Sequence, residues 1–414
     1  MCGIIAAASE SDVVNILLNG LYKMEYRGYD SAGLAIQDNN SIEHIRTLGK
    51  VKKLEEKLLE IKPTSRLGIA HTRWATHGKP SEINAHPHKS SERIYIVHNG
   101  IIENHNQLKD FLKKEGYNFS SETDSEIIAH FLDYFLKQGK NIVDAIYKTK
   151  EKLNGAYAIA VIDKEDKKNI YLARNKSPLL IGLGKSENFA ASDLLAIGET
   201  AESYIALEDG DVGVISSKDY KIYDHSKKQT ERKILKIDSN LKSSDKGNYR
   251  HFMEKEIYEQ PQAVLNTLDG RVGGGDVRED IFGKGSSELF KKVKRIQIVA
   301  CGTSLHAARV ASNWLSSISG IPTQIDYASE YRYRNPHVDK DSLFVTISQS
   351  GETADTLAAL KYSEEKDYLS SVTICNAPTS SIARESKYFF YTNAGPEIGV
   401  ASTKAFTTQL VGLM

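Results

Sequence analysis

The 414-residue sequence contains few cysteines and has no excess of either charge. Its three cysteines, Cys2, Cys301 and Cys375, are too sparse and too far apart for a disulfide framework. This pattern is typical of a reducing compartment, so we expect a cytoplasmic protein. Lysine plus arginine and aspartate plus glutamate each number 54, which gives a formal net charge of zero. That balance indicates neither nucleic acid nor an anionic membrane as a partner.

Long apolar runs are also absent from the sequence. No stretch approaches the roughly 20 apolar residues that a membrane-spanning helix requires, so we expect no transmembrane segment. The short apolar run at residues 4–8 follows no basic residue and meets Ser9 and Glu10 at once, which argues against an export signal. The length of the chain suffices for two or three domain cores.

The two halves of the chain differ in their pattern of secondary structure. In the first half, β-rich runs surround segments with helical periodicity, which predicts an α+β domain with layered sheets. Those helices are expected near residues 13–26, 51–60, 104–115, 124–138 and 141–153. The polar stretch 225–250 predicts a linker. From residue 294 strands and helices alternate, which favours a doubly wound parallel sheet. We therefore expect domains at 1–240 and 285–414, with a linker and a helix at 241–284.

Two strand-to-helix junctions in the second half carry hydroxyl groups. The two junctions lie in the segments QIVACGTSLHAA and FVTISQSGETADTL. The polar residues at them are Thr303, Ser304, Ser348, Gln349, Ser350 and Thr353. Small hydroxyl residues and glycine at a helix N-terminus suit a phosphate, and open α/β sheets bind ligands at the carboxyl ends of their strands. The hydroxyl groups could instead be plain helix caps, but two such junctions on neighbouring strands favour an anion site. Neither junction has the GxGxxG pattern, so we expect no dinucleotide.

Half of the 12 histidines fall within residues 71–105. His86 and His88 flank a proline, no cysteine accompanies them and no carboxylate lies at ligand spacing, so we expect no metal. Arg73, at the end of a strand-like run, offers a fork suited to a carboxylate. Asn99 and the Gly100 backbone offer donors to an oxyanion at the end of another run.

Two residues remain open on position alone. Asp124 can hold a cationic amine, or it can cap a helix that begins at Ser125. Cys2 can be a small buried residue in a core strand, which is the usual place of a free cysteine. It can also be a nucleophile whose own α-amino group serves as the base after removal of Met1. Position alone favours the buried cysteine.

Ordered motifs resolve part of this ambiguity. Six motifs, in order across 1–240, resemble those of the class II N-terminal-nucleophile glutamine amidotransferases. They are MCGI, EYRGYDSAG, HTRWATHG, NAHPH, VHNGIIEN and SETDSE. CGTS, SQSGETADTL and GVASTKAFTTQL resemble the sugar isomerase (SIS) domain across 285–414. Joined by RHFMEKEIYEQP, the two are similar to the glutamine–fructose-6-phosphate aminotransferase family. The resemblance implies an αββα hydrolase sandwich followed by an α/β doubly wound parallel sheet, and it makes Cys2 the expected nucleophile.

The same resemblance implies the roles of individual residues. Cys2 attacks glutamine, while Asn99 and Gly100 stabilise the oxyanion. The residues expected to bind glutamine are Arg73, Thr76, His77 and Asp124. Arg27 and Trp74 are expected to support the pocket or to act as its lid. The residues expected to bind the sugar phosphate are Thr303, Ser304, Ser348, Gln349, Ser350, Thr353, Val400 and Ser402. The expected reaction converts glutamine and fructose 6-phosphate into glutamate and glucosamine 6-phosphate, the first step of hexosamine biosynthesis, in a homodimer without a cofactor.

One feature departs from this family. The sequence stops at Met414, inside an apolar helix expected from about Thr403, whereas the family continues with a second SIS domain that supplies the isomerising base. We therefore expect residues 1–414 to retain only the glutaminase reaction. An amidotransferase acting on phosphoribosyl pyrophosphate would need an acidic phosphoribosyl-binding loop, which is missing after residue 240. A sugar-phosphate sensor would have no use for Cys2 with Arg73 and Asp124.

Overall fold

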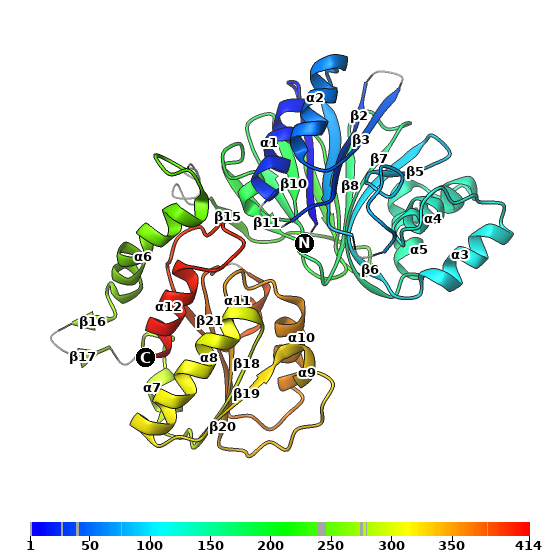
Figure 1. Ribbon diagram of the computed structural model, residues 1–414. Coiled ribbons are helices and arrows are strands. Elements are labelled where there is room, and N and C mark those ends of the chain that lie inside the picture. The colour runs from blue at the N-terminus through cyan, green and yellow to red at the C-terminus, as the bar shows by residue number, and fades with distance from the viewer. Residues whose placement is uncertain are drawn as a thin grey trace. The chain divides into compact units, whose positions relative to one another are not determined.

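The computed structural model describes residues 2–25, 28–38, 41–75, 77–237, 246–273, 276–278, 280–378 and 380–414. The chain divides into two compact units, Met1–Ser243 and Ser244–Met414 (Figure 1). Each unit has its own sheets and its own apolar cores. In the described part of the chain, no helix combines the length and apolar character needed to cross a membrane.

Unit 1 contains two antiparallel sheets stacked on each other. The strands of the first sheet are β1 (Gly3–Ser9), β2 (Ser31–Gln37), β3 (Ile42–Leu48), β4 (Leu67–Arg73), β9 (Leu180–Leu183), β10 (Glu187–Ala191), β11 (Ser203–Ala206) and β15 (Ile234–Lys236). Their order is β15-β11-β9-β10-β1-β4-β2-β3. The strands of the second sheet are β5 (His88–Ser90), β6 (Ile94–Ile102), β7 (Gly155–Asp163), β8 (Ile170–Asn175), β12 (Val212–Ile215), β13 (Tyr220–Tyr223) and β14 (Gln229–Thr230). Their order is β14-β13-β12-β8-β7-β6-β5.

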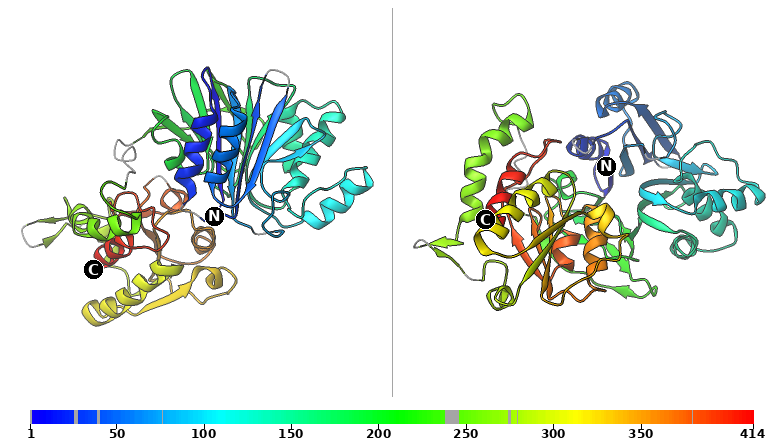
Figure 2. Two further views of the ribbon diagram at one scale, coloured as in Figure 1. Left: turned by 45° about the horizontal axis from the view of Figure 1, so that its top comes forward. Right: turned by 60° about the horizontal axis from the view of Figure 1, so that its bottom comes forward.

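Helices cover the outer faces of both sheets, as Figures 1 and 2 show. These helices are α1 (Val14–Met24) and α2 (Val51–Ile61) on the first sheet, and α3 (His105–Lys114), α4 (Glu126–Lys137) and α5 (Ile142–Lys150) on the side of the second. A short 3-10 helix, η2 (Leu194–Ala196), contacts α1. The layers are therefore αββα, and the expected fold class of the first half is confirmed.

Strand β1 explains why the sequence begins with an unbroken apolar run. Ile5 and Ala7 pack into the core beneath α1, whereas Ile4 and Ala6 pack into the core between the two sheets. Successive side chains of a strand point to opposite faces, so a strand with a core on each side needs apolar residues at every position. This double burial fixes the direction and position of the strand that carries Cys2.

The first part of the segment expected to be a linker is folded, and residues 238–245 of that segment lie outside the described residues. Residues 229–236 contain two short strands, and β15 pairs antiparallel with β11 at the edge of the first sheet. Arg232 in this segment donates two hydrogen bonds, of 3.0 and 2.8 Å, to the fully buried Asp211 carboxylate. The prediction of a linker over 225–250 was therefore wrong for its first part, because one arginine pairs with a buried acid and anchors a polar edge strand.

Unit 2 contains a parallel sheet, as the alternation of strands and helices predicted. Its strands are β18 (Arg295–Ala300), β19 (Thr323–Tyr327), β20 (Ser342–Ser348), β21 (Ser370–Cys375) and β22 (Tyr388–Tyr391). They follow the order β19-β18-β20-β21-β22, with every pair parallel. The helices are α6 (Phe252–Leu268), α7 (Ser286–Phe290), α8 (Gly302–Trp314), α9 (Ala328–Tyr331), α10 (Ala354–Ser363), α11 (Ser381–Glu385) and α12 (Lys404–Leu413). A π-helical turn, η4 (Leu315–Ser319), extends α8, and β16 (Val272–Gly273) pairs with β17 (Asp276–Val277).

The strand order of unit 2 reverses at β18. From β18 the chain moves through α8 to β19 on one side, and it later returns to β20 on the other side. In open α/β sheets, ligands bind beyond the carboxyl ends of the strands that flank such a reversal. The two hydroxyl-rich junctions follow β18 and β20, so the structure places both at this point.

Gly33 on β2 offers a test of how tightly unit 1 is packed. A Cβ atom added there would lie 2.3 Å from the His86 carbonyl oxygen and 2.8 Å from the Ile45 carbonyl oxygen. Because both neighbours are backbone atoms, they cannot move aside as a side-chain tip can. We expect Gly33→Ala to lower the free energy of unfolding by about 1–3 kcal/mol, seen as a lower urea midpoint. Gly273→Ala, where the new methyl meets nothing within 4 Å, is the control. Equal midpoints for the two variants would contradict this packing.

Candidate functional site

Cys2 lies at the beginning of β1, between strands of the first sheet. Gly3 is paired with Thr72 of β4, so Cys2 lies beside the last residue of that strand, Arg73. The Cys2 Sγ atom accepts a hydrogen bond from the Trp74 N–H at 3.2 Å and lies 3.5 Å from the Trp74 carbonyl oxygen. The expected nucleophile therefore contacts the loop that follows β4.

Asn99 and Gly100 lie on β6, in the second sheet. The Asn99 Nδ2 atom donates a hydrogen bond of 3.2 Å to the Cys2 carbonyl oxygen, although the residues are 97 positions apart. Gly100 has φ of 133°, and a Cβ atom there would lie 1.9 Å from the Ala156 carbonyl oxygen. Only glycine fits such a position. The structure thus brings Asn99, one of the two expected oxyanion donors, to the expected nucleophile from a different sheet.

The environment of the Cys2 thiol keeps it protonated. Burial raises the pKa of this thiol above its ordinary value, and the Trp74 N–H opposes that rise only in part. Within the described ranges, no histidine or carboxylate lies at hydrogen-bonding distance from Sγ, whose contacts are with the Trp74 backbone. The thiol therefore needs a base before it can act as a nucleophile.

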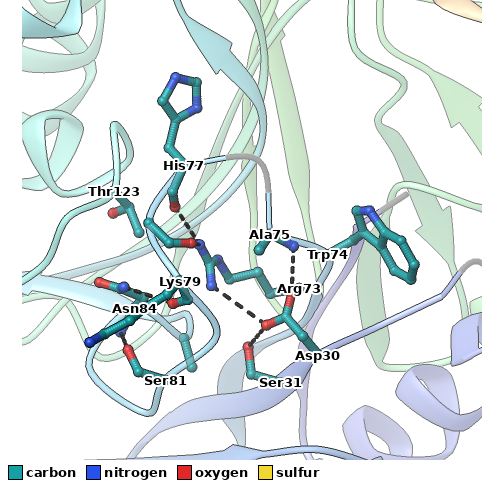
Figure 3. A network of polar contacts seen from close by, with 12 residues as sticks. Asp30, Ser31, Arg73, Trp74, Ala75, His77, Lys79, Ser81, Asn84 and Thr123 are labelled. Carbon is teal, nitrogen blue, oxygen red and sulfur yellow. Dashed lines mark hydrogen bonds and ion pairs between the residues drawn. The ribbon is translucent and has the colours of Figure 1, made fainter.

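Arg73 is 3% exposed and is held by its own loop (Figure 3). Its Nη2 atom donates to the Gly78 carbonyl at 3.0 Å and to the His77 carbonyl. Its Nη1 atom lies 3.5 Å from the Asp30 carboxylate. These contacts turn the residues after β4 back towards the strand and keep the guanidinium next to the position of Cys2.

Asp30 is a site residue that sequence reasoning missed. Its Oδ2 atom accepts the Ala75 N–H at 2.5 Å, its Oδ1 atom accepts the Ser31 hydroxyl at 2.8 Å, and its own N–H donates to the Arg73 carbonyl at 2.7 Å. Figure 3 shows this carboxylate between Arg73 and Ala75. Asp30 therefore fixes Arg73 and Ala75, the neighbours of Trp74, whose backbone contacts Cys2. The motif EYRGYDSAG contains it, but no spacing in the sequence relates it to partners more than 40 positions away.

Asp124 does not cap the following helix. The N-cap of α4 is Ser125, and the Asp124 Oδ2 atom instead accepts the backbone N–H of Ile102 at 2.8 Å. Of the two roles left open for Asp124, helix capping is therefore excluded, because the carboxylate satisfies a backbone donor at the end of β6. This bond ties Asp124 to the strand that carries Asn99.

The remaining glutamine-site residues are placed in part. Arg27 and Thr76 lie outside the described residues. His77 gives its carbonyl to Arg73, and its ring makes an edge contact with His105 at 4.9 Å. Trp74 is 53% exposed, and its ring lies so close to Gly28 that a Cβ atom there would be 2.6 Å from it. An exposed ring next to the nucleophile agrees with a lid, which stays a prediction.

Four histidines are buried together behind the site. The His71 ring lies 4.1 Å from that of His86, which lies 4.5 Å from that of His88. Burial lowers the pKa of His71 and of His88 to about 3, and it also lowers the pKa of His86 and of His98. These rings are therefore uncharged at neutral pH. Among the residues that the structure describes, no three His, Cys, Asp or Glu side chains are grouped to hold a metal ion.

In unit 2, the first sugar-phosphate residues lie at the two junctions. Thr303 is exposed in the first turn of α8, and the Ser304 hydroxyl accepts a hydrogen bond from Gln409 at 3.1 Å. The Ser348 hydroxyl accepts the Gly351 N–H at 3.0 Å and lies 3.3 Å from the Thr353 hydroxyl. Thr353 stands at the N-cap of α10 without a side-chain cap bond.

The remaining residues at the second junction and in the loop before α12 are also placed. The Ser350 hydroxyl accepts the Glu352 N–H at 3.2 Å, and the Gln349 carbonyl accepts the Asn376 N–H at 3.2 Å. Val400 is 87% exposed, and the Ser402 hydroxyl donates to Glu397 at 3.2 Å. The structure thus brings Ser348 and Thr353 together, while the contact of all these residues with a sugar stays a prediction.

Buried acids that the sequence analysis did not single out hold the loop with Val400 and Ser402. The Glu397 Oε1 atom accepts the Thr403 N–H at 2.8 Å and the Ala405 N–H at 3.0 Å. Glu256 of α6 accepts the Ile398 and Gly399 N–H groups at 2.5 and 2.9 Å. No sequence signal relates α6 to a loop some 140 positions later, so only the fold shows these contacts.

Comparison with known proteins identifies both units. The family described as glutamine amidotransferase domain matches residues 71–199, and the SIS domain family matches residues 289–414. The chain is 52% identical over 415 aligned residues to the glutamine–fructose-6-phosphate aminotransferase (isomerizing) of Pseudomonas aeruginosa, and 50% identical to that of Escherichia coli strain K12. Each alignment covers 100% of this chain and 68% of the relative. The solved structure of the allosteric regulatory enzyme of purine biosynthesis matches 90% of this chain and 80% of its own, with a TM-score of 0.50 and 19% identity, and shows the fold alone.

These findings define the class of the protein as a class II glutamine amidotransferase whose amidotransferase unit is followed by an SIS unit. The resemblance seen in the ordered motifs is thereby confirmed. With about half of its residues identical over its whole length, the chain belongs to the glutamine–fructose-6-phosphate aminotransferase family. It spans 68% of the length of these relatives.

The buried histidines predict how stability depends on pH. Their pKa values in the folded unit lie below the value near 6.5 of an unfolded chain, so below about pH 6.5 the unfolded chain binds more protons. The free energy of unfolding should hold its full value above that pH. It should fall by about 1.4 kcal/mol per pH unit for each of His71 and His88, whose pKa values lie at about 3, between about pH 6 and pH 4.

Urea unfolding between pH 8 and pH 4.5 measures this dependence. His88→Gln should make the slope shallower by about one proton, whereas His337→Gln, at a histidine whose side chain is 91% exposed, should leave it unchanged. A slope that both variants alter equally would contradict the assignment to buried rings.

Proposed function

We propose that unit 1 hydrolyses glutamine with Cys2 as nucleophile, and that in the reaction of the family the ammonia released aminates fructose 6-phosphate to glucosamine 6-phosphate. The observation that carries the proposal is the direct contact between Cys2 and Asn99 across the two sheets. Membership of the glutamine–fructose-6-phosphate aminotransferase family supports the choice of substrates. The expected domains, with glutaminase residues in 1–240 and SIS residues in 285–414, are part of the proposal.

The base in this mechanism is the α-amino group of Cys2 itself. After removal of Met1, that amine has a reference pKa near 8, so roughly 10–20% of it is uncharged at pH 7. The neutral amine takes the proton of the half-buried thiol, and the thiolate attacks the γ-carbonyl carbon of glutamine. The protonated amine then returns its proton to the leaving nitrogen, which departs as ammonia. Water hydrolyses the thioester that remains, and glutamate is released.

Asn99 and Gly100 stabilise the oxyanion formed in this attack. One Asn99 Nδ2 hydrogen is donated to the Cys2 carbonyl, and the other is available to the substrate. The Gly100 N–H supplies a second donor from the same strand. Each such donor typically contributes on the order of 10²–10³ in rate, because it is already aimed at the position where negative charge develops.

Arg73 and Asp124 hold the two charged ends of the glutamine backbone. The remaining N–H groups of the buried Arg73 guanidinium bind the α-carboxylate, and the Asp124 carboxylate binds the α-ammonium group. Their positions are supported by backbone contacts, since Arg73 is fixed by Gly78 and Asp124 by Ile102. His77 and Thr76 complete the pocket, with Arg27 in support and Trp74 as the lid.

The sugar phosphate is assigned to the edge of unit 2 where the strand order reverses. The phosphate is held by the junctions after β18 and β20, and the sugar lies near the loop before α12. The residues proposed here are Thr303, Ser304, Ser348, Gln349, Ser350, Thr353, Val400 and Ser402. The family resemblance also supports a cytoplasmic homodimer that uses no cofactor.

The nucleophile is tested by removing its thiol and, separately, by blocking its amine. Cys2→Ala should abolish release of glutamate and ammonia from glutamine without unfolding unit 1, since alanine fits the same strand. An uncleaved residue before Cys2 should cost nearly as much, because the amine is then an amide. Cys301→Ala, in unit 2, is the matched control and should keep full glutaminase activity. Activity in either Cys2 variant would return this cysteine to a purely structural role.

Residues that bind the glutamine backbone should affect KM, whereas the oxyanion donor should affect kcat. Arg73→Lys and Asp124→Asn should each raise KM for glutamine about 10- to 100-fold, because each removes a charge-assisted hydrogen bond. Asn99→Ala should lower kcat by about 10²–10³, since its donor acts mainly in the transition state. Arg93→Lys, at an arginine paired with Asp163 elsewhere in unit 1, should change neither constant. Variants altered in stability alone would mean that the pocket is wrongly assigned.

A further inference from the structure

A buried histidine that the mechanism has not used contacts the oxyanion donor. His71 lies on β4, two residues before Arg73, and is fully buried. Its Nε2 atom lies 2.9 Å from Asn99 Oδ1 and 3.1 Å from the His98 carbonyl oxygen. No substrate atom can reach this ring directly, so any role that His71 has in the reaction must act through Asn99.

The His98 carbonyl fixes the tautomer of His71. A carbonyl oxygen can only accept, so the Nε2 atom that faces it must carry the hydrogen. A neutral imidazole has one N–H, which leaves Nδ1 without a hydrogen, and this buried atom has no hydrogen-bond partner among the described residues. Burial lowers the pKa of His71 to about 3, which keeps the ring neutral with its one hydrogen on Nε2. The histidine is therefore a donor of fixed direction.

This donor in turn fixes the orientation of the Asn99 amide. The amide atom that faces a donating Nε2 must be an acceptor, so it is Oδ1 and not Nδ2. The opposite side of the amide gives the same answer independently, because the Cys2 carbonyl oxygen needs a donor and therefore faces Nδ2. In the reversed orientation the amide would present an oxygen to the Cys2 carbonyl and to the oxyanion.

We propose that His71 is a positioning residue for glutamine hydrolysis, which holds the Asn99 amide with its N–H groups towards Cys2. The inference rests on the proposed role of Asn99 as an oxyanion donor. A fixed donor costs no reorganisation when charge develops in the transition state, whereas a freely rotating amide would spend part of its time with the wrong end towards the substrate. His71 would thus affect kcat and leave the binding of ground-state glutamine nearly unchanged.

Three substitutions of His71 test the need for a donor at the Nε2 position. The amide nitrogen of His71→Gln can occupy nearly the place of Nε2, whereas that of His71→Asn is too short to reach it, and His71→Leu has no donor. We expect His71→Leu and His71→Asn to lower kcat about 10- to 100-fold, less than loss of the donor itself, with KM changed by less than about threefold. His71→Gln should restore kcat to within about fivefold of the natural enzyme.

A double variant shows whether the effect passes through Asn99. In an Asn99→Ala background, His71→Leu should cause little further loss of kcat, because the amide that it orients is gone. Alkylation of Cys2 by iodoacetamide, which needs no oxyanion donor, should proceed at the natural rate in His71→Leu. His130→Gln is the matched control, since this buried histidine contacts Ser90, Glu126 and the rings of Tyr117 and Phe119, and it should keep the natural kcat.

Several outcomes would overturn the inference. A natural kcat in His71→Leu, or an equal loss with and without Asn99, would show that His71 does not act through this amide. A slower alkylation of Cys2 would place the defect at the nucleophile. If His71→Leu fails to fold, the difference between Gln and Asn at position 71 decides the question, and equal activities would count against it. Full activity in Asn99→Ala alone would instead remove the proposed function on which the inference rests.

Discussion

The hydrogen bond between the Asn99 amide and the Cys2 carbonyl joins the two sheets of unit 1 at the point where the chemistry is proposed. Neither residue could be placed by its own sheet, because β1 and β6 belong to different layers. Their distance is set by the core between the layers, to which β1 contributes Ile4 and β6 contributes Val97. Protein interiors are close-packed, so a change of side-chain volume in this core shifts one layer against the other. The geometry of the site is therefore a property of the whole sandwich.

Around that bond, the site buries polar groups in two different ways. The Arg73 charge is retained at 3% exposure because Asp30 and two backbone carbonyls surround it. The histidines behind it are instead kept neutral by burial. A neutral ring loses far less solvation free energy on burial than a charge does, so it needs fewer hydrogen-bond partners. Removing one partner of the charged group leaves an unpaired ion, which typically costs more than the pair contributes. The buried charge of Arg73 therefore depends on all of its partners, which explains why the His77 and Gly78 carbonyls face its guanidinium.

Sequence patterns predicted those features that depend on local or periodic signals. The helices of unit 1, the parallel sheet of unit 2 and the two hydroxyl-rich junctions follow from periodicity and from the alternation of strands and helices. The polar segment around Arg232 was mistaken for linker, because its anchor is a buried acid distant in sequence. The sequence leaves two roles open for Asp124, since an aspartate before a helix often caps it. Only the fold shows that its carboxylate accepts the backbone N–H of Ile102. Asp30 and His71 escaped notice for the same reason, as their partners lie in other strands.

The carboxylate of Glu397 gives the proposed sugar site a polarity. It accepts the N–H groups at the start of α12, so the positive end of that helix is already neutralised by the protein itself. The first turn of α8 contains no acidic residue, and Asp355 in the first turn of α10 pairs with Arg332 at 2.9 Å. The start of α12 is therefore less suited to an anion than the start of α8, because a carboxylate of the protein already accepts its N–H groups. If the sugar phosphate binds as proposed, its charged end faces the junctions after β18 and β20 and its neutral hydroxyl groups face Ser402, and Glu397 then contributes to which way round the substrate lies.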